Sequence, residues 1–228
     1  MLKRREWSTL TPMTQMIDPA VAAYVQANCT PADDVLRDLA AETTDLFPDA
    51  AEMQVSHDEG RLLTMLVQLT GAAYAVEVGV FTGYSALCIA RGLPADGRLL
   101  ACDVSEEWTT LARKYWRRGG VEDRIDLRIA PAEQTLRALA ADPVIDFAFL
   151  DADKTGYPAY YEALVPRLRP GGLLVIDNVL LGGRVLDPTP GRPAHLAVQR
   201  LNETVLRDDR VDSVMLPVRD GVTLIRKR

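Results

Sequence analysis

The sequence has 228 residues, of which 48% are hydrophobic and 25% are charged. These values are typical of a folded protein with a large core and exclude a predominantly disordered chain. The formal net charge of −6 argues against a general binder of nucleic acid. Because no apolar run is long enough to cross a membrane and no secretory signal is evident, we expect a cytoplasmic protein without a membrane partner.

The N-terminal part is expected to form a loose arm over residues 1–15 and helices over residues 16–70. Thr30–Pro31 predicts the start of one of these helices, since proline is favoured at the first helical position. Ser56 and Glu59 stand three residues apart, directly before a helical pattern of leucines. That spacing predicts a capping box, in which the two side chains satisfy backbone groups at the helix start.

From residue 71 onward, short apolar runs alternate with amphipathic segments. Five strand–helix units in series predict a parallel, doubly wound α/β sheet, and a final pair of strands around Arg219–Gly221 predicts an antiparallel hairpin that completes seven strands. The expected strands cover residues 76–80, 99–104, 125–129, 146–150, 173–176, 211–218 and 222–225, and the helices between them cover 84–91, 106–118, 132–140, 157–168 and 195–207. We expect residues 71–228 to form this core within one domain, 1–228.

The first strand of the core leads into the segment EVGVFTGYS, residues 77–85. Glycines at a strand-to-helix turn let the backbone approach a ligand closely, and Asp103 ends the next strand, where a carboxylate can accept hydrogen bonds from a ribose. The GxGxxG pattern of dinucleotide-binding proteins is absent, which weakens an NAD(P) interpretation. Glu77 favours a cofactor with positive charge, such as S-adenosylmethionine. The alternative is that the glycines only pack the helix on the strand.

Polar side chains also follow two later strands of the sheet. Asp151 and Lys154 come after one apolar run, and Asp177–Asn178 after the next. Ligands bind outside the carboxyl ends of the strands in such sheets, so these groups can share one cleft. Their hard oxygens suit Mg²⁺ or Ca²⁺, and Lys154 could remove a proton from a hydroxyl. The alternative is that Asp177–Asn178 merely caps a turn.

Five segments in this order resemble the cation-dependent O-methyltransferases of the caffeoyl-CoA and catechol O-methyltransferase type. The likeness runs from about residue 14 onward and implies a Rossmann-like class I methyltransferase fold with extra N-terminal helices, and S-adenosylmethionine as methyl donor. The segments are MQVSHDEG (53–60), EVGVFTGYS (77–85), LDADK (150–154), GGLLVIDNV (171–179) and LPVRDGVTL (216–224).

The resemblance also implies a role for individual residues. The implied donor-binding residues are Val55, Glu77, Gly79, Ser85, Asp103, Ala132 and Asp151. The implied ligands of Mg²⁺, or of Ca²⁺ or Mn²⁺, are Asp151, Asp177 and Asn178. The implied catalytic residues are Lys154, as base or proton acceptor, and Asp151.

The expected reaction is therefore methyl transfer to one oxygen of a catechol-like small molecule, in a homodimer that serves bacterial secondary metabolism. Residues 179–188 depart from the plant pattern where the acceptor is chosen, so caffeoyl-CoA itself is not the expected acceptor. The first alternative is an O-methyltransferase that acts on a hydroxylated uridine in transfer RNA. An NAD(P)-dependent oxidoreductase and a noncatalytic protein that binds S-adenosylmethionine are the other two.

Overall fold

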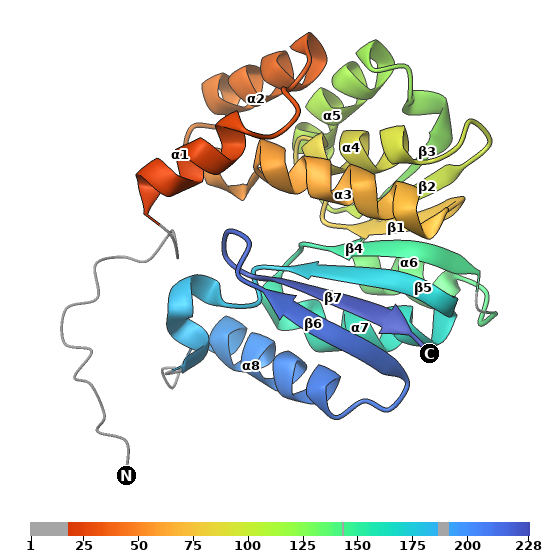
Figure 1. Ribbon diagram of the computed structural model, residues 1–228. Coiled ribbons are helices and arrows are strands. Elements are labelled where there is room, and N and C mark those ends of the chain that lie inside the picture. The colour runs from red at the N-terminus through yellow and green to blue at the C-terminus, as the bar shows by residue number, and fades with distance from the viewer. Residues whose placement is uncertain (1–17, 143, 187–191) are drawn as a thin grey trace.

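The structure is a computed structural model that describes residues 18–142, 144–186 and 192–228. The arm expected over residues 1–15 lies outside the described residues. One sheet organises the rest of the chain (Figure 1), with the strand order β3-β2-β1-β4-β5-β7-β6. Its strands are β1 (Tyr74–Val78), β2 (Arg98–Asp103), β3 (Ile125–Ile129), β4 (Ile145–Leu150), β5 (Leu168–Asp177), β6 (Val211–Leu216) and β7 (Val222–Lys227).

The first five strands are parallel, and β7 pairs antiparallel with both β5 and β6. The predicted parallel sheet with a C-terminal hairpin is thus confirmed. The chain runs outward from β1 to β3 and then returns to place β4 on the other side of β1. This reversal creates a switch point between β1 and β4, and ligands of open α/β sheets bind in the crevice at such a point.

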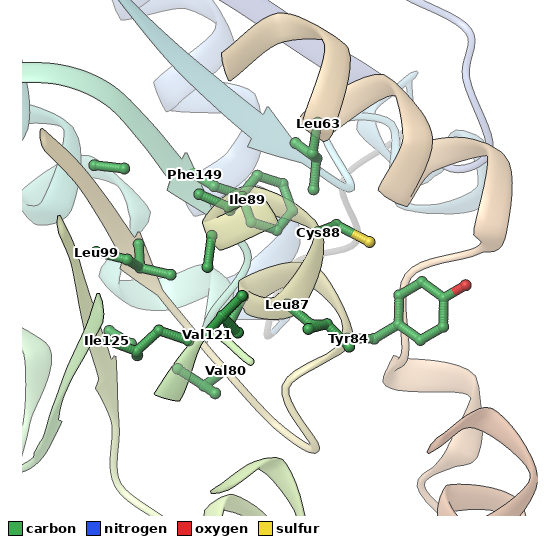
Figure 2. Packing of buried hydrophobic residues seen from close by; sticks show 14 of the residues in the cluster. Leu63, Val80, Tyr84, Leu87, Cys88, Ile89, Leu99, Val121, Ile125 and Phe149 are labelled. Atoms are coloured by element: carbon green, nitrogen blue, oxygen red, sulfur yellow. The ribbon is translucent and has the colours of Figure 1, made fainter. Parts of the chain in front are cut away.

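Helices cover both faces of the sheet. The α-helices are α1 (Pro19–Ala27), α2 (Asp34–Leu46), α3 (His57–Thr70), α4 (Tyr84–Gly92), α5 (Glu106–Arg118), α6 (Ala132–Ala138), α7 (Tyr157–Leu164) and α8 (Pro193–Leu206). One buried cluster joins the strands to α2, α3, α4 and α5, and a second joins them to α6, α7 and α8. Figure 2 shows part of the first cluster, where side chains of α3 and α4 meet those of the strands.

Strand β4 shows why a continuous apolar run was needed at the centre of the sheet. Phe147 and Phe149 belong to the first cluster, whereas Ala148 and Leu150 belong to the second, and all four are fully buried. Successive side chains of a strand point to opposite faces, so a strand covered on both faces must be apolar at every position.

Several expected boundaries were wrong. Helix α2 begins at Asp34 rather than at Thr30–Pro31, because the Asp33 side chain caps it by accepting from the Leu36 N–H at 3.0 Å. Strand β5 begins at Leu168 rather than at 173, with residues 169–172 forming an irregularity in its pairing with β4, since Ile145 pairs with Leu168 and Phe147 with Leu173; α7 ends at Leu164 rather than at 168. The Arg169 guanidinium pairs with Asp146 and donates to the Thr70 carbonyl at 3.0 Å, which holds this segment against the sheet.

Candidate active site

A cleft of about 1220 Å³ opens at the carboxyl ends of the strands. Its walls come from the ends of β1, β2, β4 and β5, from the start of α3, from α1, and from the segments on either side of α8. All the predicted site residues line this cleft except Glu77, which is buried behind it. The lining members are Val55, Gly79, Ser85, Asp103, Ala132, Asp151, Lys154, Asp177 and Asn178.

Gly79 allows the turn after β1 to lie directly against the end of β4. Its φ of +92° is in the left-handed region, and a Cβ atom built on it would lie 1.9 Å from the Asp151 carbonyl oxygen. No side chain larger than hydrogen fits between two backbones this close. The glycine is therefore required where the predicted donor loop meets the predicted metal site.

Glu77 is a fully buried carboxylate at this junction. Neither of its oxygens has a hydrogen-bond partner among the described residues. Burial raises the pKa of Glu77 to about 8; the nearby Ser85 hydroxyl opposes this rise, and the charges of Asp103 and Asp151 add to it. A ligand with positive charge placed near Glu77 would stabilise its ionised form.

Asp103 holds two loops together at the end of β2. One carboxylate oxygen accepts from the N–H groups of Val80 and Phe81 at 2.8 and 2.9 Å. The other accepts from those of Val104 and Ser105 at 2.7 and 2.8 Å. Four backbone bonds occupy the four lone-pair positions of a carboxylate, so a ribose hydroxyl at Asp103 would share a position with the backbone.

Lys154 is held by two partners beside the end of β4. Its Nζ donates to Asp151 Oδ1 and to the Tyr157 hydroxyl, both at 2.7 Å. The Tyr157 hydroxyl in turn donates to the Asp177 carbonyl at 3.0 Å. Tyr157 is fully buried, and burial followed by the charges of Asp151 and Asp177 raises its pKa well above the ordinary value. This chain of contacts connects the strand ends of β4 and β5.

Asp177 and Asn178 lie together at the end of β5. Asp177 is 4% exposed, and its Oδ1 accepts from the Asn178 N–H at 2.6 Å. Asn178 has a φ of +55°, a conformation that asparagine adopts more readily than most residues. Burial and then the charge of Asp151 raise the pKa of Asp177 to about 7, although the Asn178 N–H, Lys154 and Arg219 oppose that rise.

Glu59 lines the cleft and does not act as the helix-capping residue that its spacing from Ser56 predicts. Ser56 is the N-cap of α3, but its side chain makes no capping bond, so the predicted capping box does not form. Glu59 is instead 1% exposed, and its Oε1 has no hydrogen-bond partner among the described residues. Glu59 lines the same cleft as Asp151 and Asp177, and burial, followed by the charges of Asp177 and Asp151, raises its pKa well above the ordinary range.

The sequence did contain a signal for Glu59. It stands four and eight residues before Leu63 and Val67, which are the buried positions on the same face of α3. A glutamate on the apolar face of a helix is unusual unless it has a partner or a ligand.

The predicted metal set consists of two carboxylates and one amide. No three His, Cys, Asp or Glu side chains form a metal-sized group within residues 18–142, 144–186 and 192–228. The predicted ligands are Asp151, Asp177 and Asn178, and asparagine is not one of those four residue types. That result therefore does not test this ligand set, which stays a prediction. The same described residues include no helix long and apolar enough to span a membrane.

The cleft and the sheet order together define a class I methyltransferase. A family model described as O-methyltransferase matches residues 26–228. The chain is 44% identical over 167 residues to the "Probable caffeoyl-CoA O-methyltransferase 1" of Dictyostelium discoideum, covering 72% of this chain and 73% of the relative. The chain therefore belongs to the O-methyltransferase family that includes the caffeoyl-CoA O-methyltransferases.

Solved structures agree with this assignment. The O-methyltransferase from Bacillus cereus in complex with SAH has a TM-score of 0.83 and 31% identity, covering 92% of this chain and 97% of its own. TomG from Streptomyces achromogenes, in complex with SAM and involved in tomaymycin synthesis, has a TM-score of 0.81 and 30% identity over 91% and 96% of the two chains. The expected enzyme class, an S-adenosylmethionine-dependent O-methyltransferase, is confirmed, and the oxidoreductase alternative is not supported.

Proposed function

We propose that this enzyme transfers the methyl group of S-adenosylmethionine to one oxygen of a catechol-like small molecule, with a divalent cation that holds both hydroxyls. The observation that carries the proposal is the meeting of two strand ends. Asp151 and Lys154 after β4 share one cleft with Asp177 and Asn178 after β5, and Gly79 brings the donor loop against them.

The charge balance of the cleft supports a bound cation. The charge of Asp151 raises the pKa of Asp177, the charges of both raise the pKa of Glu59, and Glu59 Oε1 lacks a hydrogen-bond partner among the described residues. Oxygen ligands of this kind fit Mg²⁺, and also Ca²⁺ or Mn²⁺. We propose that Asp151, Asp177 and Asn178 hold the ion, whose chemistry is to lower the pKa of nearby hydroxyl groups.

Lys154 is the proposed catalytic base. Its two hydrogen bonds, to Asp151 and Tyr157, fix the amine beside the proposed acceptor site. From there Lys154 can take the proton of the reacting hydroxyl or, as an ammonium, stabilise the phenolate that forms. Asp151 orients Lys154 and contributes its other oxygen to the site. The chain thus supplies positioning and electrostatic stabilisation for an in-line methyl transfer.

The donor is proposed to lie along the ends of β1, β2 and β3. A cationic donor near Glu77 would stabilise the ionised form of its carboxyl group, and Gly79 lets the loop lie against Asp151. Asp103 is the proposed ribose partner and Ala132, at the start of α6, the proposed adenine contact. Val55, Ser85 and Asp151 complete the proposed donor site.

A transfer RNA hydroxyuridine is the second candidate acceptor, because it presents a hydroxyl to the same chemistry. The net charge of −6 favours the small molecule, since affinity for nucleic acid depends on contacts of basic side chains with phosphates. We further propose a homodimer located in the cytoplasm, with a role in bacterial small-molecule biosynthesis. Light scattering of the purified chain would test the dimer.

The experiment that tests the proposal measures methyl transfer from labelled S-adenosylmethionine to a simple catechol, with Mg²⁺ and with a chelator. We expect metal-dependent label in the catechol. Binding of S-adenosylhomocysteine, measured by calorimetry in parallel, tests the donor site separately. Donor binding without label in the catechol would refute the acceptor class, and labelled transfer RNA in the same assay would favour the second candidate. Transfer that persists undiminished with the chelator would refute the metal.

A further inference from the structure

Arg219 occupies a strained position in the hairpin between β6 and β7. Its φ is +46°, a left-handed conformation that costs a residue with a side chain about 1–2 kcal/mol and that glycine adopts freely. The residue is exposed and lines the cleft. Residues with a strained backbone are concentrated at active sites and ligand-binding sites.

A second arginine reaches the same cleft from another segment. Arg184 lies in the short 3₁₀ segment η5 (Leu181–Leu186), which follows β5. The Arg184 side chain is exposed and lines the cleft. Figure 1 shows this segment and the β6–β7 hairpin at the same end of the sheet. Asp220 ties them together, since its side chain accepts from the Gly182 N–H at 2.5 Å and its carbonyl from the Leu180 N–H at 3.0 Å.

The charges of both arginines act on Asp220, the hairpin residue that bonds to the segment of Arg184. Burial raises the pKa of Asp220, and the charges of Lys154, Arg184 and Arg219 act against that rise. Arg219 also acts on Glu59 and Asp177, so its charge reaches the proposed reaction centre. Neither arginine forms an ion pair within 4.0 Å with a residue in the part of the chain that the structure describes.

We propose that Arg219, with Arg184 from the same cleft, binds a carboxylate on the side chain of the methyl acceptor, which makes the acceptor an anionic catechol. The inference rests on the proposed function, because the two hydroxyls must lie at Asp177 for the rest of the acceptor to extend towards the arginines. A guanidinium binds a carboxylate through two parallel hydrogen bonds, which also fixes the orientation of the ring. Which of the two hydroxyls meets the donor would then depend on this contact.

The competing explanation is that Arg219 only offsets the negative charge of Glu59 and Asp177. The two explanations differ in how they treat a neutral acceptor. An arginine that binds the acceptor's carboxylate favours an acid over its ester by the strength of two direct hydrogen bonds, whereas an arginine that only balances the acids changes this preference weakly, through a charge that solvent screens. The test therefore compares 3,4-dihydroxycinnamate with its methyl ester in the holoenzyme with Mg²⁺.

Arg219→Gly is the principal variant, because glycine accepts the backbone conformation and the fold is retained. We expect wild type to prefer the acid over the ester, and the ratio of their kcat/KM values to fall roughly 10- to 100-fold in this variant, the usual scale for a hydrogen bond to a charged group. The fall should appear mainly in KM for the acid. Arg184→Gln should lower the ratio less, and Arg200→Gln, an exposed arginine of α8 outside the cleft, should leave it unchanged.

Equal changes for acid and ester in Arg219→Gly, or a wild-type enzyme that does not prefer the acid, would overturn the inference and leave the proposed function intact. A wild-type enzyme that binds S-adenosylhomocysteine by calorimetry but methylates neither compound would overturn the proposed function and the inference with it.

Discussion

The close approach at Gly79 makes a prediction that a single methyl group can test. In Gly79→Ala the new Cβ would lie 1.9 Å from the Asp151 carbonyl oxygen and 2.6 Å from its carbon. Both are backbone atoms, so no side chain can rotate away to relieve the overlap. We therefore expect β1 and β4 to separate at their carboxyl ends.

The expected loss of stability has two parts. The left-handed conformation costs alanine about 1–2 kcal/mol, and forcing extra volume into a filled space costs about 1–3 kcal/mol more. Gly79→Ala should therefore lower the free energy of unfolding by about 2–5 kcal/mol. Gly71→Ala is the matched control, since Gly71 also has a positive φ, of +60°, but nothing lies within 4 Å of its built Cβ. The control should show only the first part.

Urea unfolding of the two variants measures this difference in stability. Equal slopes of the two transitions would confirm that the unfolded states match. Calorimetry should show at least a tenfold loss of affinity for S-adenosylhomocysteine in Gly79→Ala and no loss in Gly71→Ala. The reasoning is refuted if the two variants are equally stable, or if Gly79→Ala binds S-adenosylhomocysteine as wild type does.

Three further predictions concern the carboxylates and Tyr157. Asp151→Ala and Asp177→Ala should each lower kcat at least 100-fold, the usual effect of losing a group that stabilises charge; methyl transfer near the wild-type rate in either variant would contradict the proposed site. Burial raises the pKa of Glu77 from its ordinary value of 4.5 to about 8 in the folded protein, so the folded state binds this proton more tightly and loses stability as the pH rises between these values. Between pH 5 and pH 8 the free energy of unfolding of wild type should therefore fall by about 3 kcal/mol relative to that of Glu77→Gln. Parallel pH profiles of unfolding for the two proteins would contradict this. Tyr157→Phe deletes the hydroxyl that holds Lys154 and should lower kcat roughly tenfold through lost positioning; an unchanged kcat would assign the tyrosine to packing alone.

The succession of strands and helices was predictable from the sequence because it follows from local patterns, whereas the order of the strands within the sheet does not. The apolar run at residues 147–150 and the acids that end β4 and β5 are visible without knowledge of any contact across the chain. Asp146, at the opposite end of β4, has a structural role, since it accepts from the Ala73 and Tyr74 N–H groups at 2.8 and 2.7 Å.

The errors arose where a distant partner decides the outcome. Glu59 has the spacing of a capping residue but is buried opposite Asp177, which is more than 100 residues away in the sequence. Residues 169–172 contain proline and glycine and break the regular pairing of β5 with β4, yet Arg169 pairs with Asp146 and the strand resumes on the same line, so that β5 starts earlier than its apolar run indicates. Local propensity cannot anticipate such contacts because they depend on the assembled sheet.

The place of β4 beside β1 also has a consequence for how the enzyme acquires its activity during folding. About 70 residues separate these two strands, and β2 and β3 lie within that interval. Closing so long a loop is slow compared with forming the local units. The two halves of the site therefore remain apart until the centre of the sheet closes. Recovery of donor binding during refolding would then report that closure rather than the formation of the helices.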